Sequence, residues 1–167
     1  MQYFASPTIL QESKDSILAW SAIAPIWKEL PYGKAKELPL FMSKLTEGQR
    51  GLISLDWCQK EIRNGGFQQL FMNATGNLVP WAIAGFSLVG AHPFSRILEE
   101  AAATLGGTYP SNPSARKKAL SALNADNKIR LQELEDTFFR LLNNGQHDLE
   151  KYRGEYVRSH PSEFVRN

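Results

Sequence analysis

The sequence predicts an all-α fold, a single domain over residues 1–167 formed by a bundle of eight or nine short helices. Apolar residues recur at spacings of three and four along most of the chain, and we find no convincing run of the strict alternation that is typical of a strand. Glycine, proline and asparagine interrupt this pattern at short intervals, but no long linker divides the chain. The length of 167 residues and the hydrophobic fraction of 43% match one globular domain.

Two helices are expected before residue 45. The first covers residues 14–30, and Pro25 should kink it or divide it in two, because proline lacks a backbone donor and crowds the preceding turn. A shorter helix follows over residues 34–44. The tryptophans fall on helical stripes, and we expect most of them to be core anchors: Trp20, Trp27, Trp57 and Trp81.

The best start signal is Thr46 followed by Gln49, which has the spacing of a capping box. The helix that it opens carries Cys58 on its inward stripe, where a free cysteine behaves as a small hydrophobe. We expect this helix to end at residues 64–66, Asn-Gly-Gly, because glycine reaches the left-handed conformation that closes a helix. A further short helix is expected over residues 67–73.

Five more helices are expected in the second half of the chain. Asn77 is predicted to cap the first, which runs to Gly90. The next three begin at Pro93, at Pro113 and after Asp126, and the last covers residues 147–159. The helix after Asp126 has the strongest apolar stripe, which we expect to face inward: Ile129, Leu131, Leu134, Phe138, Leu141 and Leu142.

The composition limits the classes of function. The chain has 19 Lys and Arg against 17 Asp and Glu, a net charge of +2 that is too small for a general nucleic-acid binder. The single cysteine cannot form an intramolecular disulfide and fits a reducing compartment. No basic segment precedes an apolar run at the N-terminus, and the longest apolar stretch, residues 79–91, is too short to span a membrane. We therefore expect a cytoplasmic protein that contacts no membrane.

No residue pattern predicts catalysis, a metal site or a cofactor. The three histidines, His92, His147 and His160, are isolated from one another, whereas a metal site needs clustered ligands. No phosphate-binding loop is present. An enzyme would instead require a pocket in which polar groups such as Gln69, Asn73 and Arg96 converge.

A basic region provides one alternative, a nucleic-acid-associated protein. Two predicted helices joined by a short turn give the outline of a helix-turn-helix. Glu133, Glu135 and Asp136 follow on the second helix and would face the phosphates, so ordinary charged surface is favoured. The candidate nucleic-acid contacts are Arg116, Lys117, Lys118, Lys128 and Arg130.

The most distinctive stretch is residues 61–76, EIRNGGFQQLFMNATG. One interpretation is structural: the glycines break a helix, and two amides four residues apart, Gln69 and Asn73, bond to backbone groups freed at the breaks. The functional alternative is a groove lined by these residues where a partner backbone can approach. The motif consists of Asn64, Gly65, Gly66, Phe67, Gln69, Asn73 and Gly76.

This motif, with the flanking helices over about residues 20–164, resembles the bacterial DNA-mimic protein family. The resemblance implies an all-α single domain that is often dimeric and has no known catalytic activity. It also implies a protein partner, because surface carboxylates in the family's named member imitate DNA phosphates and occupy the DNA-binding faces of regulatory proteins.

The charge of this chain argues against a full imitation of DNA. Duplex DNA carries roughly one charge per 1.7 Å, so 30 Å of mimicry needs on the order of 18 charges on one face. The 17 acids here are offset by 19 basic residues. We therefore predict a non-catalytic protein that binds another protein. Toxin immunity is one specific form of this prediction, and homodimer formation is left open.

Overall fold

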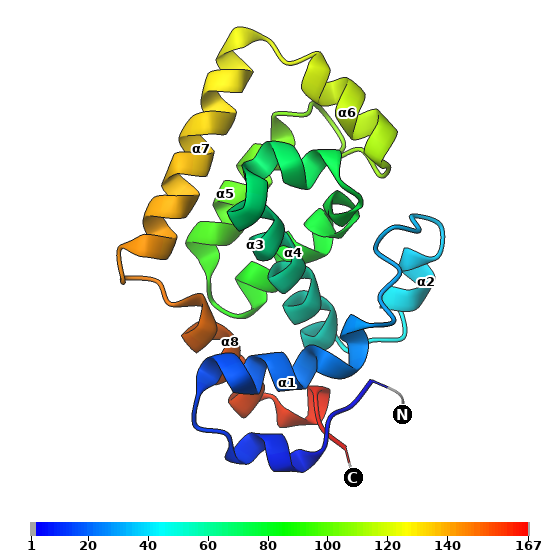
Figure 1. Cartoon of the computed structure of the whole chain (residues 1–167), viewed down its shortest axis with the longest axis vertical. Coiled ribbons are helices and arrows are strands. Elements are labelled where there is room, and N and C mark those ends of the chain that lie inside the picture. Colours follow the sequence, from blue (N-terminus) through cyan, green and yellow to red (C-terminus); the bar gives the residue numbers. More distant parts are fainter. Residues whose placement is uncertain (1–2, 167) are drawn as a thin grey trace.

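The computed structural model describes residues 3–166 and confirms the all-α prediction. Eight α-helices and three 3-10 helices form one domain within this range (Figure 1). The α-helices are α1 (Asp15–Trp27), α2 (Leu38–Met42), α3 (Glu47–Met72), α4 (Val79–Leu88), α5 (His92–Ala103), α6 (Pro113–Ser121), α7 (Ala125–Asn143) and α8 (Leu149–Ser159). The 3-10 helices are η1 (Pro7–Gln11), η2 (Ala74–Leu78) and η3 (Pro161–Glu163).

Helix α3 lies at the centre of the molecule and packs against α1, α4, α6 and α7 (Figure 1). Its start is the predicted capping box: the Gln49 N–H donates to Thr46 Oγ1, and the Thr46 N–H donates to Gln49 Oε1, both at 3.1 Å. Gly51 and Gly85 allow α3 and α4 to approach closely, because a Cβ atom on Gly85 would collide with the backbone of Gly51. The long central helix thus begins where the sequence predicts, and four other helices pack against it.

The hydrophobic core extends around the second part of α3. Its centre contains five fully buried rings that contact one another edge to face or in stacks: Phe67, Phe71, Phe86, Phe94 and Phe138. Cys58 is also fully buried, as predicted, and burial raises the pKa of its thiol. A thiol in this setting is protonated at neutral pH and acts as a core residue.

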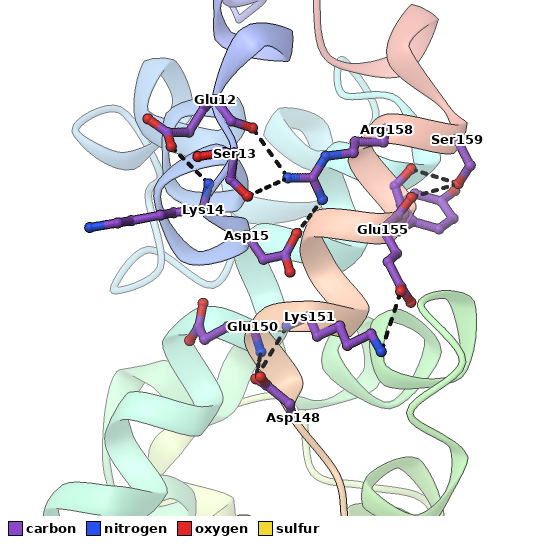
Figure 2. Close-up of polar contacts among 11 residues, drawn as sticks. Glu12, Ser13, Lys14, Asp15, Asp148, Glu150, Lys151, Glu155, Arg158 and Ser159 are labelled. Atoms are coloured by element: carbon purple, nitrogen blue, oxygen red, sulfur yellow. Dashed lines mark hydrogen bonds and ion pairs between the residues drawn. The ribbon is translucent and has the colours of Figure 1, made fainter.

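The first and the last segments within residues 3–166 meet at the opposite end of the molecule from α6 and the start of α7 (Figure 1). Helix α8 packs along α1, and Arg158 of α8 donates to the carbonyls of Glu12 and Ser13, at 3.2 and 3.1 Å, and pairs with Asp15 (Figure 2). A parallel bridge joins Ala5 to Val165. We call this contact between the two ends the α1–α8 junction.

Several predicted elements differ in detail. Asn77 does not cap α4: it is buried, and the turn η2 leads directly into a helix that starts at Val79. Helix α7 begins at Ala125, slightly before the predicted start after Asp126, and is capped by Asn124, whose side chain accepts from the Asn127 N–H. Ile129 on α7 is 59% exposed, so its predicted inward position is wrong. Within residues 3–166, no helix is long and apolar enough to cross a bilayer.

The tryptophans are less buried than predicted. Trp20 is 42% exposed beside Ile17, which is 44% exposed, and the other three are partly buried. Trp27 stacks on Trp57 with a ring-centre distance of 4.2 Å, and the Lys60 ammonium lies over the rings of Trp20 and Trp27. Trp20 is therefore a surface residue of an aromatic cluster and not a core anchor.

Candidate functional site

The glycine motif forms a sharp corner inside α3. Gly65 has φ −161° and ψ 27°, and Gly66 has φ 72° and ψ −171°, so two helical segments meet at these residues. The positive φ of Gly66 is a conformation that glycine adopts at little cost. The predicted helix break at residues 64–66 is confirmed, and Phe67 begins the second segment with a fully buried ring.

The corner is held on one side by the carboxylate of Glu61. One of its oxygens accepts hydrogen bonds from Gln69 Nε2 at 2.7 Å and from Asn73 Nδ2 at 2.6 Å. The other oxygen accepts from Thr75 Oγ1 at 3.0 Å. The prediction that the two amides share a face is confirmed, but the expectation that they bond to freed backbone groups is wrong, because both donate to a side chain. Glu61 thus connects the helix before the corner to the helix and turn after it.

Helix α7 holds the corner from a second direction. Glu135 accepts a hydrogen bond from the Phe67 N–H at 2.7 Å. This N–H belongs to the first turn of the second helical segment, where backbone donors lack partners within the helix. A Cβ atom on Gly66 would collide with the Glu135 carboxylate, so a side chain at this position would push the carboxylate away from the Phe67 N–H.

Arg116 closes the end of the motif from α6. Its side chain is fully buried, and burial lowers the pKa of its guanidinium, which remains charged at neutral pH. A Cβ atom on Gly76 would lie 2.7 Å from Arg116 Nε, so the guanidinium packs directly against that glycine. The guanidinium donates four hydrogen bonds of 2.8–3.1 Å, to the carbonyls of Phe71, Asn73 and Pro110 and to Asn77 Oδ1.

The buried position of Arg116 corrects the predicted basic region. A side chain with 0% exposure cannot contact phosphates, so Arg116 does not belong to a nucleic-acid surface. Arg130 is exposed but pairs with Glu100 and Glu133. Three exposed lysines remain from the predicted set: Lys117, Lys118 and Lys128.

A groove runs along the outer side of the corner, between the second segment of α3 and the α6–α7 hairpin. The α3 side is formed by Gly65, Gln68 and Met72. The hairpin side includes Lys117, Leu120, Leu123, Lys128 and Leu131. The volume is about 690 Å³, and a second hollow of about 450 Å³ shares the three α3 residues and reaches Gln69 and Asn73. The motif therefore has two sides, an internal hydrogen-bonded corner and an open groove.

The polar residues proposed for an enzyme site do not converge here. Gln69 and Asn73 are bound to Glu61, whereas Arg96 is exposed on α5 and lines neither hollow beside the corner. Three residues that position the corner were not assigned this role from the sequence: Glu61, Thr75 and Glu135.

A comparison with models of protein families assigns the chain to a family. A family model described as DMP19-like protein matches residues 43–160, which is more than two thirds of the chain. This chain belongs to the DMP19-like protein family. The assignment supports the predicted resemblance to a DNA-mimic family. No curated protein and no solved structure matches the chain.

The matched part of this DMP19-like protein contains the corner, the groove and α8, whereas α1 lies outside it. Helix α1 nevertheless contributes buried residues to the same core, including Leu18, Ile23 and Ile26. Helices α1 and α2 both precede the matched residues, and both pack into the core of the matched region.

Proposed function

We propose that this DMP19-like protein acts without catalysis, by binding a second protein. Membership of the family supports a role in protein interaction. The observation that carries the proposal is the use of the motif's polar groups. Gln69 and Asn73 both donate to Glu61, and Arg116 is buried among carbonyls. The outer side of the same corner is an open groove. Such an arrangement supports a rigid surface for docking.

The distribution of charge supports binding without imitation of a whole DNA duplex. Full mimicry over 30 Å needs on the order of 18 negative charges on one face. The chain has 17 acidic residues, and at least seven of their carboxylates lie within 4 Å of a lysine or arginine. These seven are Asp15, Glu37, Asp56, Glu100, Glu133, Glu150 and Glu155. Paired carboxylates present a weaker negative field, so we propose that local shape and charge provide the recognition.

Affinity purification tests this proposal. The tagged full-length protein is used to capture partners from a lysate of its native organism, at low and at moderate salt. We expect one protein to be retained in stoichiometric amount, because a packed interface tolerates moderate salt. Recovery of no protein at any salt concentration would contradict the proposal. So would retardation of duplex DNA in a gel-shift assay that weakens steeply with salt, since this behaviour indicates phosphate binding.

A further inference from the structure

The groove beside the corner combines unpaired positive charge with apolar surface. We propose that it binds a short acidic segment of a protein partner, with an apolar side chain of that segment on the leucines and its carboxylates at Lys117 and Lys128. This inference rests on the proposed function and names the surface and the chemistry of the partner.

The size and floor of the groove suit a peptide side chain. Its volume of about 690 Å³ falls in the range of sites that enclose small ligands or anchoring side chains. Leu120, Leu123 and Leu131 supply apolar surface from the hairpin, and Met72, which is 39% exposed, supplies it from α3. Methionine adapts its shape easily and recurs at peptide-binding grooves. An amphipathic segment could therefore insert its apolar side between the two walls.

The charge of the rim specifies an acidic segment. Lys117 comes from α6 and Lys128 from α7, so positive charge is present on both helices of the hairpin. Within residues 3–166, neither lysine lies within 4 Å of a carboxylate. Glu135 also lines the groove, but its carboxylate already accepts the Phe67 N–H. Carboxylates of a partner would complement these lysines and favour the correct register.

A protein segment fits this surface better than a nucleic acid. Phosphate binding depends on a row of cations, but Arg116 is buried and Arg130 is paired with Glu100 and Glu133. The groove that contains the two free lysines is also lined by three leucines, which gain nothing from contact with a phosphate backbone. Apolar anchors beside charged residues are instead typical of protein interfaces.

The direct test is a titration of the isotope-labelled full chain followed by NMR. The probe is a short peptide of Glu, Leu and Ala, and the matched control peptide has Lys in place of every Glu. We expect the acidic peptide to shift the backbone signals of Gly65, Gln68 and Leu131, and added salt to weaken this binding. The absence of any shift at about 1 mM acidic peptide, which corresponds to the weakest useful affinity, would overturn the proposal. Equal binding of the basic peptide would overturn it as well.

Two pairs of variants locate the binding. We expect the double variant Lys117→Glu with Lys128→Glu to weaken binding of the acidic peptide about tenfold or more, and Lys118→Glu to change it less than about twofold. Lys118 is the matched control because it is exposed on the same helix but does not line the groove. For the apolar contact, binding of the acidic peptide to Met72→Gln is compared with its binding to Ile129→Gln. Ile129 is the control because it is an exposed residue of α7 outside the groove. Unchanged binding in the double variant, or shifts of the same signals by duplex DNA, would overturn the assignment.

The same variants separate this proposal from the proposed function. If the wild type and the double charge-reversal variant capture the same protein partner equally, the groove is not the docking site but protein binding stands. If neither protein captures a partner at any salt concentration, the proposed function itself fails. Circular dichroism melting of each variant shows whether the fold is retained, which is expected because all the substituted lysines are exposed.

Discussion

The corner of α3 and the α1–α8 junction are each held by an arginine that donates to backbone carbonyls. The arginine at the corner is buried, whereas the arginine at the junction is exposed. At the corner, Arg116 donates to the carbonyls of Phe71, Asn73 and Pro110 and has no exposed surface. At the junction, Arg158 donates to the carbonyls of Glu12 and Ser13 and pairs with Asp15, but its side chain is 37% exposed (Figure 2). Water can replace the second set of contacts and cannot reach the first. We therefore expect burial, more than the number of hydrogen bonds, to determine how much each arginine stabilises the fold.

Replacing Arg116 is expected to have the largest effect. Arg116→Met removes the donors from several buried acceptors, each of which costs roughly 1–3 kcal/mol when it is left without a partner. We expect a loss of about 3–5 kcal/mol in the free energy of unfolding, because water that enters the site replaces some of these donors. Urea denaturation followed by circular dichroism measures it.

If the methionine variant does not fold, Arg116→Lys is used in its place. Lysine keeps the positive charge but has fewer donors, so we still expect a loss of about 2 kcal/mol in the free energy of unfolding. The control is Lys117→Met, the exposed neighbour on α6, which should change the free energy of unfolding by less than about 0.5 kcal/mol. A similar loss for Lys117 and Arg116 would show that burial does not distinguish the two.

The corner itself provides the second prediction. Gly66→Ala places a side chain at φ 72°, in a region that is nearly restricted to glycine, and against the Glu135 carboxylate. We expect a loss of about 2–3 kcal/mol, because strained backbone conformations of this kind cost on the order of 1–3 kcal/mol before the contact is considered. Thermal and urea denaturation measure the change.

Gly33→Ala is the control for this variant. Gly33 lies in an exposed turn, and a Cβ atom there would have no heavy atom within 4 Å. Its stability should change by less than about 0.5 kcal/mol. Equal effects at the two glycines would mean that the conformation of the corner contributes nothing specific.

Local signals in the sequence were sufficient to predict the elements that surround this corner. The capping box at Thr46 and the break at Gly65 and Gly66 depend on residues within one or two turns of each other, so spacing alone reveals them. The partners of the corner come from far along the chain. Glu135 lies 68 residues from Phe67, and Arg116 lies 39 residues from Asn77. These contacts depend on how α6 and α7 fold back onto α3, which spacing does not encode.

The exposure of two residues, Arg116 and Ile129, was predicted wrongly because it also depends on how the helices pack. Arg116 belongs to a basic run with Lys117 and Lys118, and charge alone predicted an exposed surface. Consecutive residues of a helix point in different directions. Arg116 therefore points inward to buried carbonyls, while Lys117 and Lys118 face solvent. The prediction for Ile129 is wrong in the opposite direction. Its apolar character suggested a core position, but on α7 the residue faces away from the core.

A third prediction concerns the carboxylate at the corner and is expected to be smaller. Glu61→Gln keeps the shape of the side chain but presents one acceptor oxygen where Gln69, Asn73 and Thr75 now donate to two. Because this cluster is partly exposed, water can satisfy the released donors, and we expect a loss of about 1–2 kcal/mol in the free energy of unfolding.

The control for Glu61 is Glu99→Gln, an exposed residue of α5, which should be nearly neutral. NMR signals of the Gln69 and Asn73 side-chain amides should also move in the Glu61 variant and stay unchanged in the control. Unmoved amide signals would show that Glu61 does not hold these groups in solution.

The smallest effect is expected at the α1–α8 junction. Arg158→Ala removes an exposed ion pair with Asp15 and two hydrogen bonds to carbonyls that solvent can reach (Figure 2). We expect a loss of about 0.5–1 kcal/mol in dilute buffer. The loss should shrink when salt is added, because screening weakens exposed charge pairs, whereas the loss caused by Arg116→Lys should not change with salt. Urea denaturation of the three proteins at low and high salt measures both quantities. An Arg158 variant as destabilised as the Arg116 variant, with no salt dependence, would mean that the junction excludes water as effectively as the corner does.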